Sequence, residues 1–153
     1  MERLHKDLRE LLALFSSNDV DFLVVGGLAV AFHGYPRFTE DLDCYVRPSV
    51  ENGTRIVRAL RAFGFGSLGI EAADFEANDR MIQLGRAPHR VDLLTRLYAV
   101  TFDDAWATKV RGSIDGVPVW FIDRESLIQN KRATGRPQDL VDADFIERLN
   151  APD

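Results

Sequence analysis

Residues 24–46, VVGGLAVAFHGYPRFTEDLDCYV, are the stretch around which the rest of this sequence is organised. An apolar run ends at Gly26-Gly27, a short apolar segment and a polar loop follow, and a second apolar run carries Asp41 and Asp43. This order predicts a strand, a tight turn into a helix, and a second strand. Side chains two residues apart in a strand point to the same face, so the two aspartates should lie side by side. Because adjacent carboxylates oppose each other's ionisation, the pair requires either water or a cation.

The composition is that of a soluble globular protein of one domain. The chain has 153 residues, of which 46% are hydrophobic and 28% charged, which excludes disordered and fibrous classes. Its net charge of −5 argues against broad non-specific DNA binding but allows a local basic site for a nucleotide. No apolar run approaches the roughly 20 residues needed to cross a membrane, and the charged N-terminus does not resemble a secretory signal. With Cys44 as the single cysteine, no intrachain disulfide can form, and we expect a cytoplasmic protein.

Apolar periodicity and turn residues predict the remaining elements of the chain. The expected fold is α+β, because the strands outnumber the helical crossovers and the sheet should therefore be mixed. We expect a single domain over residues 1–153, with a core over about 20–122 and two C-terminal helices over about 124–149. Residues 64–69 should form a turn or loop, and residues 71–78 fit either a helix or a loop. Helices are predicted over 2–17, 28–32, from Ser49 to Gly64, within 99–109, and over 124–134 and 138–149; strands are predicted over 22–25, 42–46, 80–84, 90–94, 110–114 and 117–122.

Three features of these elements could carry chemistry, and each also has a purely structural reading. Gly26-Gly27 between a strand and a helix could let backbone N–H groups approach an anion, or it could simply form a tight turn. The Asp41–Asp43 pair could hold a cation or could be solvated. Asp92 is a lone acid in the apolar run HRVDLL, where a charge is costly unless it binds a cation or faces water at a sheet edge.

Taken in order, these features resemble the signature of the nucleotidyltransferase superfamily of the DNA polymerase β type. The resemblance is closer to the small single-domain nucleotidyltransferases of bacteria and archaea, including those of toxin–antitoxin and abortive-infection modules. Such proteins show a Gly-Gly pair, a small-residue helix ending in His-Gly, and then Arg-x-Thr-x-Asp-x-Asp, as residues 26–43 do here. Residues 127–142, LIQNKRATGRPQDLVD, are similar to the Lys-Arg-Ala-x-x-Arg-x-x-Asp-x-x-Asp segment of the same group. The resemblance covers the chain from the first predicted strand to near its end.

The resemblance implies a nucleotidyltransferase fold and a metal-dependent reaction. Asp41, Asp43 and Asp92 would be the metal ligands, for Mg²⁺ or for Mn²⁺ in its place, and Asp92 would also assist the attacking hydroxyl. Gly26 and Gly27 would cradle the triphosphate of an NTP. A hydroxyl of a protein, an RNA or a small molecule would attack the α-phosphate, and pyrophosphate would leave.

Four further residues are candidates for nucleotide binding. Arg37 lies in the loop that faces the glycine pair, where it could contact phosphates or could be a surface arginine. Thr39 could contact the nucleotide or bond locally to Asp41. The resemblance suggests that Lys131 and Arg136 reach the nucleotide, but both could instead pair with acids of the last helix on a solvated helix face.

The acceptor is not specified by the sequence, and a second reading of the function stays open. In that reading the chain is a catalytically silent nucleotidyltransferase fold that binds or neutralises a cognate partner protein. The presence of all three carboxylates favours the enzyme.

Overall fold

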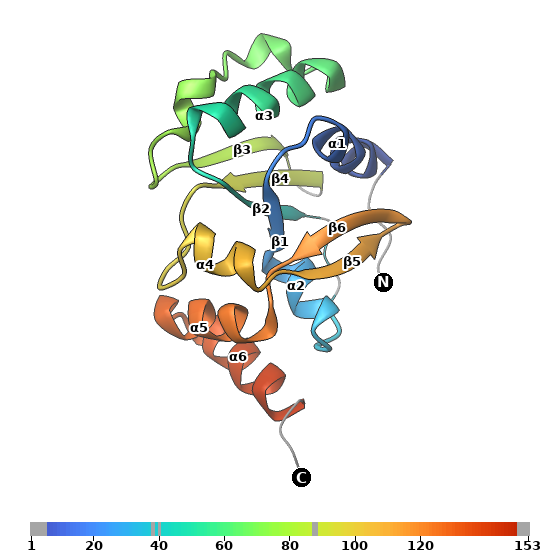
Figure 1. Ribbon diagram of the computed structural model, residues 1–153. Helices are drawn as coiled ribbons and strands as arrows, with labels where there is room; N and C mark the ends of the chain where they lie inside the picture. The colour runs from blue at the N-terminus through green and yellow to red at the C-terminus, as the bar shows by residue number, and fades with distance from the viewer. Residues whose placement is uncertain (1–5, 38, 40, 87–88, 150–153) are drawn as a thin grey trace.

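A mixed β-sheet lies at the centre of the molecule (Figure 1). The computed structural model describes residues 6–37, 39, 41–86 and 89–149. Six strands within these residues form one sheet in the order β3-β4-β2-β1-β6-β5. The β1–β2, β3–β4 and β5–β6 pairs are antiparallel, while β2–β4 and β1–β6 are parallel, so the predicted mixed α+β sheet is confirmed. The strands are β1 (Phe22–Val25), β2 (Leu42–Val46), β3 (Met81–Arg86), β4 (His89–Leu94), β5 (Val110–Ile114) and β6 (Val117–Phe121).

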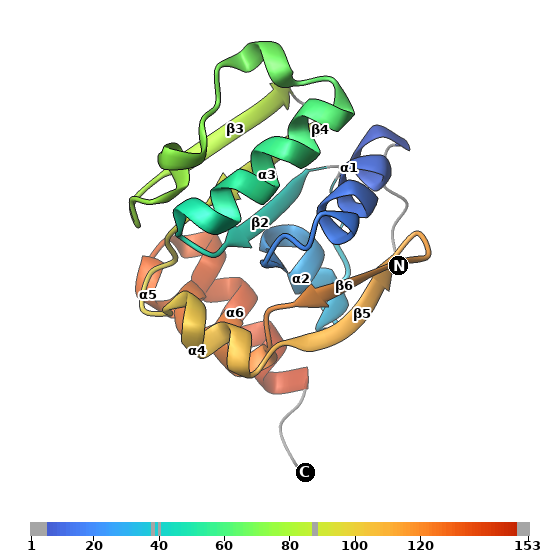
Figure 2. The same cartoon turned by 45° about the horizontal axis from the view of Figure 1, so that its top comes forward.

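All of the α-helices except α2, which follows β1 directly, lie in two groups around this sheet (Figure 1). Figure 2 shows α1 and α3 side by side in front of the central strands, while α4, α5 and α6 gather at the lower end of the view in Figure 1. The α-helices are α1 (Lys6–Ser17), α2 (Gly26–Phe32), α3 (Val50–Phe63), α4 (Phe102–Ala107), α5 (Arg124–Thr134) and α6 (Pro137–Leu149), and the 3₁₀ turns are η1 (Gly66–Leu68) and η2 (Ala72–Phe75).

Most predicted elements occur where the sequence pattern places them, with differences at their ends. Helix α2 begins at Gly26 instead of residue 28, because the chain turns at that glycine directly out of β1. Helix α6 begins at Pro137, since proline lacks an N–H group and is tolerated at the first helical position. Ser49 caps α3 as expected, with its hydroxyl accepting a hydrogen bond from the Asn52 amide. Residues 2–5 and the turn at 87–88 lie outside the described residues.

Strand β1 is the centre of the core, and its position explains its composition. All four of its residues are buried, as expected for a strand that has neighbours on both edges and is covered on both faces. Helix α1 packs its buried side chains at helical spacing, with Leu8, Leu12 and Phe15 on one face. Cys44 is fully buried in β2, and burial raises the pKa of its thiol. This rigid centre positions the ends of β1 and β2, where the candidate site lies.

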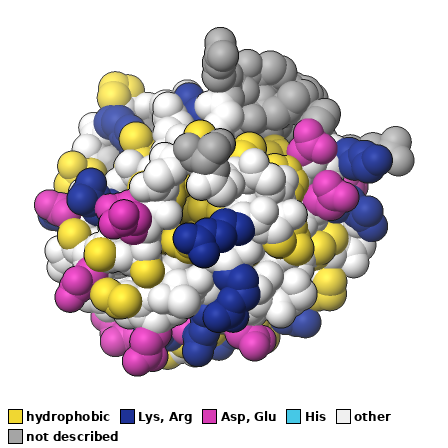
Figure 3. Space-filling view, turned by 90° about the horizontal axis from the view of Figure 1, so that it is seen from above, with side chains coloured by type: hydrophobic (Ala, Val, Ile, Leu, Met, Phe, Trp, Pro, Cys, Tyr) yellow, Lys and Arg dark blue, Asp and Glu magenta, His cyan; other side chains and the backbone are white. Residues whose placement is uncertain are grey.

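The outer surface carries charges of both signs. On the face seen in Figure 3, Lys and Arg side chains lie among Asp and Glu side chains. None of the helices in the described part of the chain is both long enough and apolar enough to cross a membrane.

Candidate functional site

The glycine turn after β1 lies directly against a carboxylate of β2. The two strands pair so that Val25 is opposite Asp43, which brings the start of α2 beside the Asp43 side chain. Gly26 has a φ of +67°, and a Cβ atom at this position would lie 2.8 Å from Asp43 Cγ and closer still to a carboxylate oxygen. A Cβ at Gly27 would lie 3.3 Å from Thr39 Cγ2. The turn is therefore enclosed by Asp43 on one side and by the loop before β2 on the other, and Gly26 is required for the close approach.

Asp43 and Asp92 form the acidic pair of the site. Strands β2 and β4 run parallel, and their register places Asp43 opposite Asp92. Since β4 lies between β3 and β2 and Asp92 is 7% exposed, the reading of Asp92 as an edge-strand residue facing water is wrong. The pKa of Asp43 is raised to about 7. The largest cause is burial, followed by the charge of Asp92, a hydrogen bond with Asp92 and the charge of Asp41, while the charge of Arg90 acts in the opposite direction. Without a cation, this pair therefore retains a proton near neutral pH.

Asp41 takes a different position from the one that the sequence pattern predicts. Strand β2 begins at Leu42, so the prediction that Asp41 and Asp43 lie within one strand is wrong. Thr39 Oγ1 accepts a hydrogen bond of 3.2 Å from the Asp41 amide, which is the local bond expected of Thr39. The Asp41 side chain is 35% exposed, and its Oδ2 lies 3.7 Å from Nη2 of Arg90.

Arg90 is the residue of this site that the sequence reasoning missed. It lies two residues before Asp92 on β4, and its Nε lies 3.3 Å from Asp92 Oδ1. Both atoms are buried, and neither has a hydrogen-bond partner among the described residues. The available signal was the i, i+2 spacing of Arg90 and Asp92, which places a cation and an anion on the same face of a strand.

A second group of charges, here called the α5–α6 charge cluster, joins the loop before β2 to the last two helices. Arg37 donates two hydrogen bonds to Asp142, with Nη1 3.0 Å from Oδ2 and Nη2 2.5 Å from Oδ1. Lys131 Nζ lies 3.1 Å from Asp139 Oδ1 and 3.4 Å from Asp142 Oδ2. Arg136 Nε donates to Asp139 Oδ2 at 2.8 Å. The cluster thus consists of Arg37, Lys131, Arg136, Asp139 and Asp142.

These contacts show what the predicted nucleotide-binding cations do in the fold. Burial alone would raise the pKa of Asp139, but hydrogen bonds from Thr134, Lys131 and Arg136, with the charge of Lys131, hold this pKa below its usual value. Lys131 is buried, so the expectation of a solvated helix face is wrong for it, whereas Arg136 is 74% exposed and fits that expectation. The roles of Arg37, Lys131 and Arg136 toward a nucleotide stay predictions, because all three cations are already paired with carboxylates.

Residues 33–35, just before Arg37, contact residues near and within the C-terminal helices through a hydrogen bond and a ring stack. His33 Nε2 lies 2.7 Å from the Ile122 carbonyl oxygen, and the Tyr35 ring stacks on Phe145 with 4.0 Å between the ring centroids. The loop that borders the glycine turn is therefore held by α6, through the Arg37–Asp142 ion pair and the stacking of Tyr35, and by the contact of His33 with Ile122 just after β6.

Asp142→Asn is expected to lower the free energy of unfolding by about 2–4 kcal/mol, because Asp142 is completely buried, Arg37 would lose its carboxylate partner and Lys131 would lose one of two. Urea denaturation at pH 7 measures the change. Asp144→Asn on the same helix is the matched control, since Asp144 pairs with Arg132 in an exposed ion pair and should lose less than about 1 kcal/mol. Equal effects of the two substitutions would contradict a structural role for the cluster.

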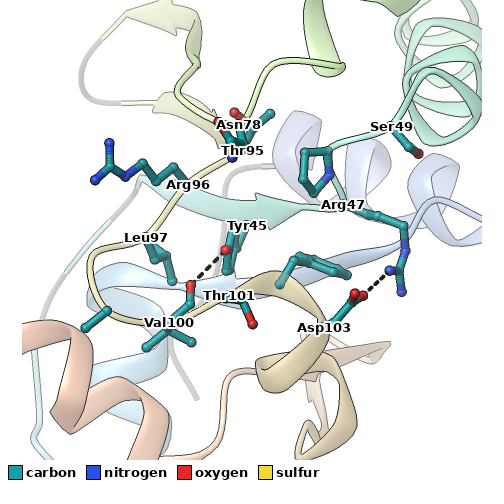
Figure 4. A pocket seen from close by; sticks show the side chains of 13 residues that line it. Tyr45, Arg47, Ser49, Asn78, Thr95, Arg96, Leu97, Val100, Thr101 and Asp103 are labelled. Atoms are coloured by element: carbon teal, nitrogen blue, oxygen red, sulfur yellow. Dashed lines mark hydrogen bonds and ion pairs between the residues drawn. The ribbon is translucent and has the colours of Figure 1, made fainter.

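A cavity of about 740 Å³ lies at the other end of β2 (Figure 4). Tyr45 of β2 and Arg47, directly after β2, are among its lining residues, and both follow Cys44 in the chain, whereas Asp43 precedes it. Its polar groups serve the fold, since the Tyr45 hydroxyl donates to the Val100 carbonyl at 2.9 Å and Arg47 pairs with Asp103 at 2.6 Å. We therefore place the candidate site at the glycine turn and the Asp43–Asp92 pair.

Comparison with known proteins bears on the family and the fold of the chain. A family model described as "Nucleotidyltransferase of unknown function (DUF6036)" matches residues 2–151. The chain belongs to this nucleotidyltransferase family. Its fold is similar to that of ANT(2″)-Ia, solved in complex with adenylyl-2″-tobramycin, with a TM-score of 0.60 and 13% identity over 94% of this chain and 87% of that one. The nucleotidyltransferase fold implied by the sequence resemblance is thus confirmed.

A second solved structure is an antigenic nucleotidyltransferase-like protein from Paracoccidioides brasiliensis. It is 17% identical to this family member over 99% of this chain and 81% of the other, with a TM-score of 0.49. No curated protein matches the sequence.

The donor set of this nucleotidyltransferase family member suits one divalent cation. Mg²⁺ usually takes one or two carboxylates together with substrate phosphates. Asp43 and Asp92 offer two carboxylates, and the buried Asp92 Oδ1 has no hydrogen-bond partner among the described residues. Over the same residues, no group of three or more His, Cys, Asp or Glu side chains is arranged to hold a metal ion. The pair fits a metal that is completed by substrate oxygens, and the role of Asp41 as a ligand stays a prediction.

Proposed function

We propose that this protein transfers a nucleoside monophosphate from an NTP to a hydroxyl group, with Mg²⁺ or Mn²⁺ bound at the acidic pair. One observation carries the proposal: Asp43 and Asp92 lie opposite each other on neighbouring parallel strands, with Asp43 against the glycine turn. Family membership and the shared fold support nucleotidyl transfer as the reaction class.

Each part of the site has a chemical role in this proposal. Gly27 lacks a side chain, so phosphate oxygens can approach the backbone of the turn. Asp43 and Asp92 would hold the metal, which when bound neutralises charge on the triphosphate. Asp92 also accepts the proton of the attacking hydroxyl, whose oxygen forms a bond to the α-phosphorus. The bond between the α- and β-phosphates breaks, and pyrophosphate leaves.

The acceptor is proposed as a hydroxyl of a protein, an RNA or a small molecule. An adenylylated small molecule occupies the solved ANT(2″)-Ia complex, which supports small molecules as one acceptor class for this fold. A cognate partner protein of a two-component module is proposed on the sequence resemblance. Incubating the purified protein with cell lysate, Mg²⁺ and each α-labelled NTP in turn identifies the acceptor as the molecule that becomes labelled.

A catalytically silent binding partner is the second candidate function. It is favoured by the contacts of Arg90, which engages Asp41 and Asp92 and leaves no three-carboxylate cluster among the described residues. Binding of NTP and Mg²⁺ without labelling of any acceptor in the lysate would select this candidate. Labelling of any acceptor excludes it.

Asp92→Asn is expected to retain NTP binding, since the Asp43 carboxylate stays available to the metal, and to reduce transfer by about 10²–10⁴-fold, because the amide cannot accept the hydroxyl proton. Nucleotide binding is measured by calorimetry and transfer by label incorporation. Asp79→Asn is the control, since Asp79 is exposed in a loop before β3 and should leave both quantities unchanged. Undiminished transfer by Asp92→Asn would remove Asp92 from the mechanism.

A further inference from the structure

We propose that Arg90 is an internal counter-ion, which neutralises part of the acidic charge in the metal-free protein and withdraws from at least one carboxylate when a divalent cation binds. The inference rests on the proposed function only for the kind of ligand, a divalent cation. The arrangement of charges itself comes from Arg90 and the three aspartates around it.

The position of Arg90 connects carboxylates that come from different parts of the chain. Its Nε lies 3.3 Å from Oδ1 of Asp92 on its own strand, and its Nη2 lies 3.7 Å from Oδ2 of Asp41, which precedes β2. Asp43 lies opposite Asp92 on the neighbouring strand β2. One guanidinium thus contacts two carboxylates, and the third carboxylate lies opposite one of these two.

The charge balance of this group is incomplete. Three carboxylates and one guanidinium leave two negative charges when all are ionised, which matches the charge of one divalent cation. At the same time, Arg90 engages the oxygen atoms that Asp41 and Asp92 would offer to a metal.

Arg90 contacts Asp92 and Asp41 without forming hydrogen bonds, so these contacts can be broken more easily than hydrogen-bonded ion pairs. Nε of Arg90 and Oδ1 of Asp92 are close but are not hydrogen bonded to each other, and neither atom has a hydrogen-bond partner among the described residues. A buried polar atom without a hydrogen bond is destabilising. Arg90 and Asp41 each have side chains that are 35% exposed, so the guanidinium has a route to solvent.

The contacts of Arg90 differ from those of Arg37, which has a structural role in the fold. Arg37 makes two hydrogen bonds to the completely buried Asp142, which is the geometry of a permanent anchor. Arg90 makes only longer ion-pair contacts, to two carboxylates at once. A residue that served only to orient Asp92 would be expected to form hydrogen bonds of the Arg37 type.

The test measures Mn²⁺ binding by calorimetry, in the full-length protein without nucleotide. Arg90→Gln should bind Mn²⁺ about 3–10-fold more tightly than the wild type, because a competing positive charge is removed from a partly exposed site. Arg90→Lys keeps the charge and should stay between the two. Arg58→Gln, which removes an exposed arginine of α3, should match the wild type. Equal or weaker binding by Arg90→Gln overturns the proposal, as does an absence of Mn²⁺ binding in both proteins.

Thermal unfolding provides a second readout that does not depend on turnover. Arg90→Gln should melt at a lower temperature than the wild type in EDTA, because three carboxylates lose their counter-ion, and saturating Mn²⁺ should remove the difference. A deficit of the same size with and without Mn²⁺ overturns the proposal by showing a merely structural role. If both Arg90→Gln results are as expected but no NTP labels any acceptor, the counter-ion role of Arg90 is supported and the proposed transfer reaction is contradicted. If an acceptor is labelled but Arg90→Gln binds Mn²⁺ no more tightly than the wild type, the transfer reaction is supported and the counter-ion role is contradicted.

Discussion

Asp43→Asn is expected to stabilise the metal-free protein at pH 8 while abolishing nucleotidyl transfer. Burial, with the charges of Asp92 and Asp41, raises the pKa of Asp43 from its ordinary value of 3.8 to about 7. Between these two values the folded protein holds a proton that the unfolded chain has lost, so stability falls as the pH rises from about 4 to about 7. Above pH 7 the whole penalty is present. An asparagine cannot ionise, so the free energy of unfolding of the variant should be higher than that of the wild type by about 2–4 kcal/mol at pH 8 and almost equal to it at pH 4.

Urea denaturation in EDTA at pH 4.5 and pH 8 measures this difference. Asp123→Asn is a control with the opposite sign. Burial would raise the pKa of Asp123, but hydrogen bonds from Ser126 and Thr108 lower it overall, and its carboxylate caps α5. Asp123→Asn should therefore lose stability at pH 8. A loss of stability at pH 8 in Asp43→Asn would contradict the raised pKa of Asp43.

The same substitution should reduce transfer by more than about 10³-fold, since it removes one of the two carboxylates that would hold the metal and leaves a neutral ligand. Mn²⁺ binding should weaken in parallel. Greater stability together with lost activity would mark Asp43 as a residue retained for function at the expense of the fold. Retention of Mn²⁺ affinity in Asp43→Asn would remove it from the metal site.

Gly26→Ala has the second large expected effect, because it introduces an atom where the Asp43 carboxylate lies. The new Cβ would meet Asp43 Cγ at 2.8 Å, and the φ of +67° is unfavourable for alanine. We expect a loss of about 2–4 kcal/mol in the free energy of unfolding. Since Asp43 must move, transfer should fall by at least about 10²-fold even in the folded fraction.

Gly69→Ala separates the two causes of this effect. Gly69 has a φ of +73°, and nothing lies within 4 Å of a Cβ built there, so the substitution carries the backbone penalty without the collision. Gly69→Ala should lower the free energy of unfolding by only about 1–2 kcal/mol and leave transfer unchanged. Denaturation and label incorporation are measured for both variants. Similar behaviour of the two would show that backbone strain alone explains Gly26→Ala and that the approach of Asp43 is unimportant.

Local patterns along the chain were sufficient to predict most of the fold. The strands of β1 and β2, the cap at Ser49 and the mixed sheet all follow from apolar periodicity and turn residues, which act over a few neighbouring residues. The same patterns selected Gly26, Asp43 and Asp92 as candidate site residues. Strand boundaries were less predictable where pairing sets them: the strand predicted over 80–84 is β3, which runs from Met81 to Arg86 because it pairs with β4 along this whole length.

The sequence by itself determined which chemical groups are present and which strands carry them. Tertiary structure alone decided which of these groups meet, because sheet order and register are properties of the whole chain. It placed β4 beside β2, so that Asp43 faces Asp92 across strands, and it brought Arg90 to Asp41. The long-range pairing of Arg37 with Asp142, 105 residues away, could likewise not be inferred from local pattern. Electrostatic energy depends on distance in space and on burial, and both arise only when the sheet has formed.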